Sequence, residues 1–193
     1  MIEWALGAGL LVAAGLLYRS LNEGRARARR EQDIPDNPCL ESPRGLRVDD
    51  VLLYGGTELW LAGCFELDEE GLVARVFRTP GNRAAPWVLQ LDEEGLELAL
   101  AHETDAVPEG TVPAELTVEH MRYTLRRRAS VVVHRAGAEL PQAPSRGEMT
   151  LLAGPGERVL LVLDFVGGPR LALRGERVPP EMLELLPAGD PEP

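Results

Sequence analysis

Residues 148–174, EMTLLAGPGERVLLVLDFVGGPRLALR, show most clearly which class of fold this chain adopts. Three short apolar runs follow one another here, separated by the breaks GPGE at 154–157 and GGP at 167–169. Short apolar runs bounded by Gly and Pro are typical of β-strands joined by turns. The stretch therefore predicts neighbouring antiparallel strands.

The same succession of short apolar runs and turns extends over residues 46–187. It predicts a mainly β soluble domain, either an antiparallel barrel or a sandwich-like structure. The halves 46–100 and 116–173 each begin with Leu-x-Val, so two similar β-subdomains are an alternative. A short helix is expected at 180–186, where prolines precede apolar residues. The predicted strands cover residues 51–54, 57–66, 72–77, 87–91, 96–101, 121–127, 130–135, 148–152, 158–165 and 171–174.

An acidic segment, LDEEGL, occurs at 67–72 and again at 91–96, each time between apolar runs. Gly71 and Gly95 stand where a turn needs a residue with a left-handed backbone. Both copies are therefore interpreted as solvated hairpin tips, and this reading is preferred to a catalytic role for their carboxylates.

An uncharged apolar run from Trp4 to Tyr18 lies near the N-terminus. As a helix rising about 1.5 Å per residue, this run and its flanks approach the ~30 Å hydrocarbon layer of a bilayer. Residues 1–21 are therefore predicted to form one transmembrane helix, with Trp4 and Tyr18 at the interfaces. Positive charges follow the run, unlike those of a cleaved signal peptide, and they place the N-terminus outside and the soluble domain in the cytoplasm. These charges are Arg19, Arg25, Arg27, Arg29 and Arg30.

Small residues recur every four positions in this run, at Ala5, Gly9 and Ala13. The small-xxx-small spacing lets two helices approach closely and is compatible with a homodimer formed through the membrane helix. Small residues are also common in membrane helices for other reasons, and that reading is preferred. In either case the sequence predicts a single-pass protein of the bacterial inner membrane, with the lipid bilayer as one partner.

Charge and composition separate the remaining parts of the chain. A polar linker with three prolines is expected at 22–45 and a disordered tail at 188–193. The net charge is -11, and all 20 basic residues are arginine. Residues 1–31 carry five arginines and three acids, a net of +2, which leaves -13 for the rest. Because nucleic-acid affinity comes largely from cations that neutralise phosphates, so acidic a domain is not expected to bind nucleic acid.

The order of segments in the β-domain resembles that of a known family. The stretches that carry it are LRVDDVLLYGGTELWLAG, WVLQLDEEGLELAL and LTVEHMRYTLRRRASVVVHRAGAEL, followed by a strand run and GERV. Together they resemble the domain of unknown function 4178 over about residues 46–178. Asp50 matches the Gly-Asp entry of that family, whereas its aromatic-acidic pair is missing at 75–77. The resemblance implies a β-rich module of membrane-associated bacterial proteins and brings no catalytic residues.

No pattern in the sequence assembles a catalytic or metal site. None of the histidines, His102, His120 and His134, lies two to five residues from another His or Cys, as compact zinc sites require. Phosphate-loop, Rossmann and G-x-S-x-G patterns do not occur. Cys39 and Cys64 have no CxxC spacing and fit a reducing compartment. We therefore expect a protein that is not an enzyme and has no metal or cofactor.

Two charged features of the β-domain are candidates for a functional role. Asp164 follows an apolar run and would be costly to bury alone, although a strand-end position or an arginine partner explains it more simply. Strand alternation sends Arg122, Arg126 and Arg128 to one side of their strand, as a basic stripe that could contact an acidic partner or lipid. A solvated face braced by acidic neighbours is the preferred interpretation of that stripe.

The leading hypothesis is a non-enzymatic protein-interaction or scaffolding module tethered to the membrane, whose β-domain binds another protein through its edges or a groove. One alternative is a small-molecule sensor with a pocket lined by Tyr54, Trp60 and Trp87. A second alternative is a hydrolase built on Asp164 and a histidine. Clustering of the three aromatic rings, or a histidine hydrogen-bonded to a cleft carboxylate, distinguishes these hypotheses.

Overall fold

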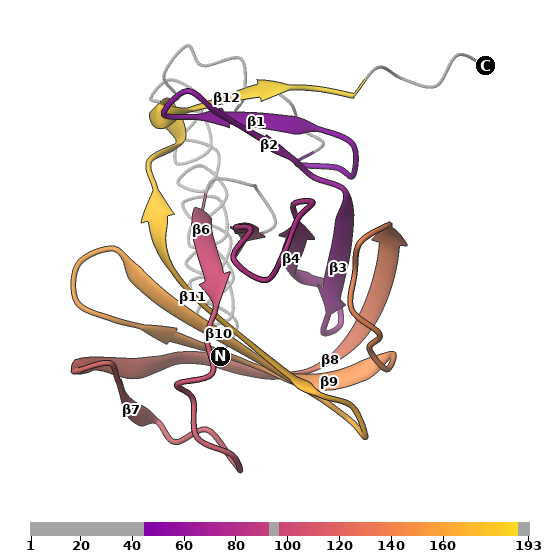
Figure 1. The fold of residues 1–193 in the computed structure, drawn as a ribbon. Helices are drawn as coiled ribbons and strands as arrows, with labels where there is room; N and C mark the ends of the chain where they lie inside the picture. The colour runs from indigo at the N-terminus through magenta and orange to yellow at the C-terminus, as the bar shows by residue number, and fades with distance from the viewer. Residues whose placement is uncertain (1–44, 93–96, 189–193) are drawn as a thin grey trace, which may run out of the picture. The chain divides into compact units, whose positions relative to one another are not determined.

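The computed structural model describes residues 45–92 and 97–188 (Figure 1). The chain divides into two units, Met1–Asn37 and Pro38–Pro193, and the described residues all belong to the second. The predicted anchor therefore lies outside the described residues, with Trp4, Ala5, Gly9, Ala13, Tyr18 and Arg19. Within 45–92 and 97–188, no helix has the length and apolar character that a membrane span requires.

The described residues form strands in two antiparallel sheets. A small sheet has the order β12-β1-β2, and a larger one has the order β3-β4-β5-β6-β11-β10-β9-β8-β7. The first six strands are β1 Val51–Tyr54, β2 Thr57–Trp60, β3 Gly63–Asp68, β4 Leu72–Arg78, β5 Trp87–Gln90 and β6 Leu98–Glu103. The others are β7 Glu115–Val118, β8 Met121–Gly137, β9 Arg146–Ala153, β10 Arg158–Phe165, β11 Arg170–Val178 and β12 Leu183–Leu186.

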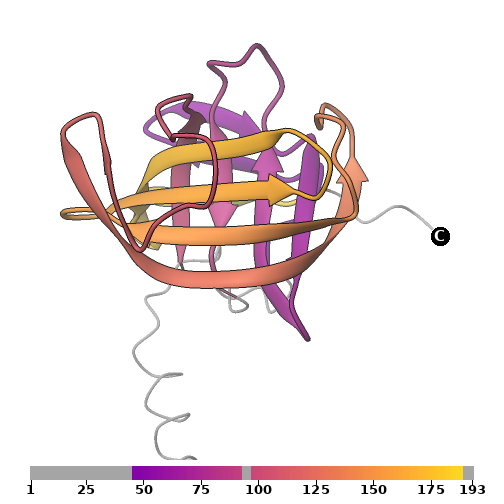
Figure 2. The same cartoon turned by 90° about the horizontal axis from the view of Figure 1, so that it is seen from below.

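The larger sheet closes into an eight-stranded antiparallel barrel, because β3 also pairs with β8. Each half of the chain supplies four consecutive strands, β3–β6 and β8–β11, and the second group runs crosswise in front of the first in Figure 2. The groups meet at two seams, β3/β8 and β6/β11. The prediction of a mainly β antiparallel domain is confirmed, and the eight strands form a single barrel.

Side chains fill the inside of the barrel. All eight barrel strands contribute to one buried apolar cluster. Its largest members include Trp87 and Phe65, whose ring centroids are 6.3 Å apart in a stacked arrangement, and Phe165, which lies 5.7 Å from Phe65. A small barrel filled in this way is a packed core, so a ligand must be recognised on its outside.

Two further apolar clusters cover the outside of the barrel. The small sheet packs Leu52, Leu59 and Leu183 against outward side chains of β3–β6, including Phe77 and Val88. On the other half, β7 and the start of β8 pack against outward residues of β9, β10 and β11. Strands such as β5 and β10 are therefore buried on both faces, which explains their uninterrupted apolar runs at 87–89 and 159–163.

Several predicted boundaries differ from the structure. The predicted strand 57–66 is two strands, because Leu61 and Ala62 carry the chain from the small sheet into the barrel. The predicted strands 121–127 and 130–135 are one long strand, β8, with a bulge between Leu125 and Arg127. Strand β7 was not predicted.

The helix expected at 180–186 is wrong. Only Pro180–Met182 form a single 3-10 turn, and Leu183–Leu186 form β12. Backbone pairing with β1 decides this, since Leu183 lies opposite Tyr54 and Leu185 opposite Leu52. In that register the inward side chains follow the period of two of a strand and join the apolar layer under the small sheet.

Glycines allow the strands to approach closely at both seams. At β3/β8, Gly63 lies opposite Gly137, and a Cβ on Gly63 would lie 2.0 Å from the carbonyl oxygen of Ala138. At β6/β11, a Cβ on Gly175 would lie 2.1 Å from the carbonyl oxygen of Leu100. In each case the obstructing atom belongs to the backbone, so only glycine fits.

Candidate functional site

The aromatic side chains proposed to line a pocket do not come together. Trp87 is fully buried inside the barrel, Trp60 is half exposed on β2, and Tyr54 lies on β1 at the edge of an outside groove. The clustering that would favour the predicted aromatic pocket is therefore not found.

Asp164 has an arginine partner, as the simpler of its two interpretations predicted. Its carboxylate accepts hydrogen bonds from Arg170 Nε at 2.5 Å and Nη2 at 3.0 Å, across the β10/β11 pair. Among the described residues no histidine hydrogen bonds to a carboxylate, and no group of three His, Cys, Asp or Glu side chains could hold a metal ion. His102 instead lies 3.1 Å from the carbonyl oxygen of Ala84, through Nδ1.

The bulge in β8 divides the predicted arginine stripe. Arg126 is the extra residue of the bulge, which reverses the direction of the side chains that follow it. Tyr123, before the bulge, packs on the same side of the sheet as Leu152, so the adjacent Arg122 points to the other side. Arg128, after the bulge, lies on the side of Leu152. Arg122 and Arg128 are therefore on opposite faces.

Each of these arginines has an acidic partner. Arg122 pairs with Glu115 at 2.6 Å, Arg128 with Glu148 at 3.5 Å, and Arg126 with Glu97. Burial tends to raise the pKa of Glu97, but hydrogen bonds from Arg126 and Arg177 outweigh burial and hold that pKa below its usual range. The use of Arg122, Arg126 and Arg128 as an interaction surface stays a prediction.

An exposed apolar row lies on the small sheet, on the face turned away from the barrel. Val51 on β1 lies opposite Trp60 on β2 and Leu186 on β12, so the three side chains stand in a line. Trp60 is 49% exposed and Leu186 is 45% exposed. We call this row, together with Leu53 beside it, the apolar sheet face.

Acidic side chains flank the apolar sheet face. The register places Glu58 and Glu184 on either side of Leu53, on the same face and both exposed. Exposed large apolar side chains gathered on one face are typical of interaction surfaces. Here the acidic neighbours add a negative charge that a cationic partner would match.

A groove of about 550 Å³ lies on the outside of the β6/β11 seam, between the small sheet and the hairpin β7–β8. Its floor comes from outward residues of β6 and β11, including Leu100, His102 and Arg174. Tyr54 lines one side, and Met121 and Tyr123 line the other. We call it the seam groove, because it lies over the β6/β11 seam.

Two ion pairs lie in the lining of the seam groove. Arg174 on β11 pairs with Glu119 at the tip of the β7–β8 hairpin, and Arg158 Nε lies 3.4 Å from a carboxylate oxygen of Glu176. All four side chains line the groove. Both pairs are partly exposed, so they contribute little to folding stability and their partners can be exchanged.

Tyr123 is the exceptional polar residue of the seam groove. Its side chain is fully buried, and its hydroxyl is one of the buried polar atoms in the described residues without a hydrogen-bond partner. Gly154 makes room for the ring, since a Cβ there would lie 2.7 Å from Tyr123 Cε1. Burial raises the pKa of this hydroxyl, and the nearby Arg174 and Arg158 oppose the rise.

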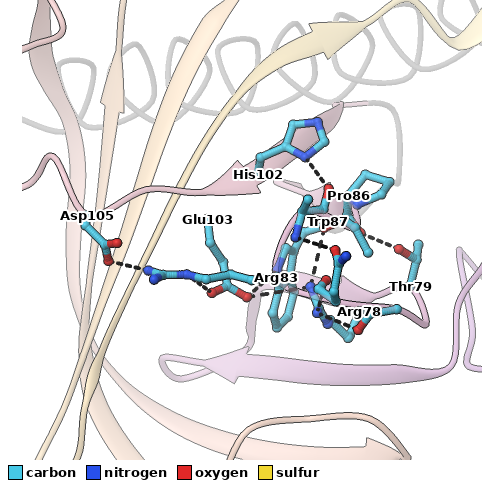
Figure 3. A network of polar contacts seen from close by, with 12 residues as sticks. Arg78, Thr79, Arg83, Pro86, Trp87, His102, Glu103 and Asp105 are labelled. Atoms are coloured by element: carbon cyan, nitrogen blue, oxygen red, sulfur yellow. Dashed lines mark hydrogen bonds and ion pairs between the residues drawn. The ribbon is translucent and has the colours of Figure 1, made fainter.

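A dense polar network holds the loop between β4 and β5 at one end of the barrel (Figure 3). Arg78, which is buried, lies 4.9 Å above the Trp87 ring and donates to backbone carbonyls of that loop, at Gly81, Asn82 and Ala85. Glu103 accepts from Trp87 Nε1 at 3.2 Å and pairs with Arg78 at 3.6 Å. Because its charges and loop carbonyls satisfy one another, we interpret the network as structural.

Cys64 on β3 is a buried free cysteine. Desolvation, with a smaller contribution from nearby Glu66, raises the pKa of Cys64 to about 12. In a Cys39→Ser background we expect no modification of native Cys64 by a thiol reagent at pH 8, and rapid modification in urea, because the thiolate is the nucleophile. Rapid modification of the native protein at pH 8 would contradict this.

The raised pKa of Cys64 also makes the stability of the folded protein depend on pH. The folded-state pKa lies above that of an exposed thiol, so this contribution to stability is complete below about pH 9 and decreases as the pH rises towards 12.

Comparisons of the chain with protein-family models, with curated proteins and with solved structures give no match. The resemblance to the domain of unknown function 4178 therefore stays a prediction.

Sequence reasoning missed both surface features. Trp60 and Leu186 are 126 positions apart in the chain, and the registers of β12 and β2 against β1 place them on either side of Val51. Arg174 and Glu119 are 55 positions apart and meet because β7–β8 folds over the barrel. The alternation of apolar residues in 183–186 was the one available signal for the strand that completes the first feature.

Proposed function

We propose that this protein is a non-enzymatic interaction module of the bacterial inner membrane. In this proposal residues 1–21 form the membrane anchor, with the N-terminus outside, and the barrel lies in the cytoplasm at the end of the linker 22–45. The arginines that follow the apolar run support this orientation. The anchor is also the part through which a homodimer could form.

The observation that carries the proposal is the apolar sheet face. Trp60, Val51 and Leu186 stand in one exposed row, whereas the inside of the barrel is filled. Tryptophan is enriched among the residues that contribute most of the binding energy in protein–protein interfaces. The flanking Glu58 and Glu184 favour a partner whose apolar segment carries arginine or lysine.

The test is comparative capture of the tagged full chain from gently solubilised membranes, followed by mass spectrometry. We expect the double variant Trp60→Ser/Leu186→Ser to lose specific protein partners that the wild type retains. Because both side chains are exposed, the variant should fold as the wild type does, with a change in stability of only about 0.5 kcal/mol. The charge-reversal variant Glu58→Arg/Glu184→Arg should lose the same partners.

The matched control is Val166→Ser, which removes an exposed apolar side chain from the turn between β10 and β11. It should retain all partners. A chain lacking residues 1–31 separates the barrel from the anchor, since partners kept by this chain are recognised by the barrel. Equal capture by the wild type and by both sheet-face variants would refute the proposal.

A further inference from the structure

The seam groove has a buried hydrogen-bond donor beside it for which residues 45–92 and 97–188 provide no acceptor. Burying a hydroxyl without a partner is unfavourable, and Tyr123 is fully buried with no partner for its hydroxyl among the described residues. The charged groups that influence this hydroxyl are Arg174, Arg158, Glu119 and Glu176, and all four line the groove. Tyr123 is itself one of the lining residues, so its buried hydroxyl lies beside the groove and near these charged groups.

The hairpin tip places a carboxylate across the same groove. Glu119 and His120 form the two-residue turn between β7 and β8, and both have positive φ, at 47° and 66°. Two-residue hairpin turns with positive φ at both positions favour Asn-Gly. Glu119 instead adopts this left-handed conformation, which is unfavourable for a residue with a side chain, and its carboxylate pairs with Arg174. The turn therefore holds a carboxylate next to Arg174 in a conformation that lowers local stability.

We propose that the seam groove binds a small molecule with a carboxylate and an apolar body, and that the ligand carboxylate replaces Glu119 on Arg174. In the complex the ligand carboxylate accepts hydrogen bonds from Arg174 and from the Tyr123 hydroxyl. Glu119 is displaced towards solvent, which is inexpensive because it is half exposed on a hairpin tip. This site is separate from the apolar sheet face and does not depend on the proposed protein partner.

The groove also has the size and the apolar surface for such a ligand. Its volume of about 550 Å³ lies in the range of small-molecule sites. Leu100, Met121 and Val178 line it beside the charged residues, so an apolar body can lie against them. The acidic side chains Glu119 and Glu176 and the overall negative charge favour a singly charged carboxylate over a phosphate dianion.

Fluorine NMR of the full chain labelled with 3-fluorotyrosine tests this directly. The protein has three tyrosines, of which Tyr54 and Tyr123 line the groove and Tyr18 lies in the predicted anchor. Titration of the detergent-solubilised protein with phenylacetate should shift the Tyr54 and Tyr123 resonances saturably and leave Tyr18 unchanged. Phenylacetamide, which lacks the charge, should shift neither, and phenyl phosphate should bind more weakly.

Substitutions of Arg174 and Glu119 are expected to change the affinity for phenylacetate in opposite directions. Arg174→Gln should weaken phenylacetate binding by about tenfold or more, because it removes a charged hydrogen-bond donor. Tyr123→Phe should weaken it as well, reported by the Tyr54 resonance. Glu119→Gln should strengthen binding about two- to fivefold, because it removes the competing carboxylate of an exposed ion pair.

The matched control is Glu115→Gln, which frees Arg122 on the same hairpin outside the groove and should leave phenylacetate affinity unchanged. An unchanged dispersion of the fluorine resonances shows that each variant is folded. The proposal is overturned if phenylacetate causes no saturable shift up to its solubility limit. It is also overturned if phenylacetamide or phenyl phosphate binds as well as phenylacetate, or if Glu119→Gln weakens binding.

Discussion

Replacement of Gly63 by alanine is expected to prevent the barrel from closing normally and to lower the free energy of unfolding by about 3 kcal/mol or more. The added Cβ would lie 2.0 Å from the carbonyl oxygen of Ala138 and 2.9 Å from Leu140 Cγ. Leu140 can rotate away, but the carbonyl is part of the chain that continues β8. Relief therefore requires the β3/β8 seam to separate, with loss of its backbone pairing.

Urea unfolding of the detergent-solubilised full chain, followed by tryptophan fluorescence, measures this effect. Gly175→Ala at the β6/β11 seam should behave similarly, since its Cβ would lie 2.1 Å from the Leu100 carbonyl oxygen. Gly156→Ala is the matched control, because nothing lies within 4 Å of its Cβ and only the positive φ of 66° opposes alanine. That change should cost about 1 kcal/mol. If Gly63→Ala costs no more than the control, close strand approach does not restrict the seam.

Replacement of Arg78 by methionine is expected to lower the free energy of unfolding by about 3 kcal/mol. The guanidinium is buried, contacts the face of Trp87, and binds carbonyls at Gly81, Asn82 and Ala85. Methionine fills part of the volume but donates no hydrogen bond. The loop carbonyls then lose their partner, and the largely buried Glu103 loses one of its cations.

Arg83 supplies the matched control for Arg78. It also pairs with Glu103, through Nε at 3.1 Å, but its side chain is 61% exposed. Arg83→Met should therefore change the unfolding midpoint little. The variant Arg78→Met/Glu103→Gln should lose less stability than the two single changes added together, because neutralising Glu103 removes the unpaired buried charge. Equal unfolding midpoints for Arg78→Met and Arg83→Met would show that burial does not strengthen the Arg78 contacts.

Two predictions from the sequence, the arginine stripe in β8 and the helix over β12, differ from the structure. Alternation along 121–128 predicted one basic stripe, but the bulge at Arg126 adds one residue and divides Arg122 from Arg128. Nothing in the local composition marks that bulge, because it arises where the strand leaves the hairpin with β7 and enters the barrel. For 183–186, the short apolar run was compatible with helix and strand, and the pairing of Leu183 with Tyr54 decided between them.

Local features could be predicted from the sequence alone: short antiparallel strands, turns at glycines, the acidic charge and a strongly apolar segment at 4–18. These follow from the residue types and their period, which act over a few neighbouring positions. The tertiary structure was needed to show that the strands close into one filled barrel, that Trp60 and Leu186 flank Val51 in one row, and that Arg174 pairs with Glu119. Such contacts depend on strand register and on the seams, where packing between distant segments, and not local preference, sets the geometry.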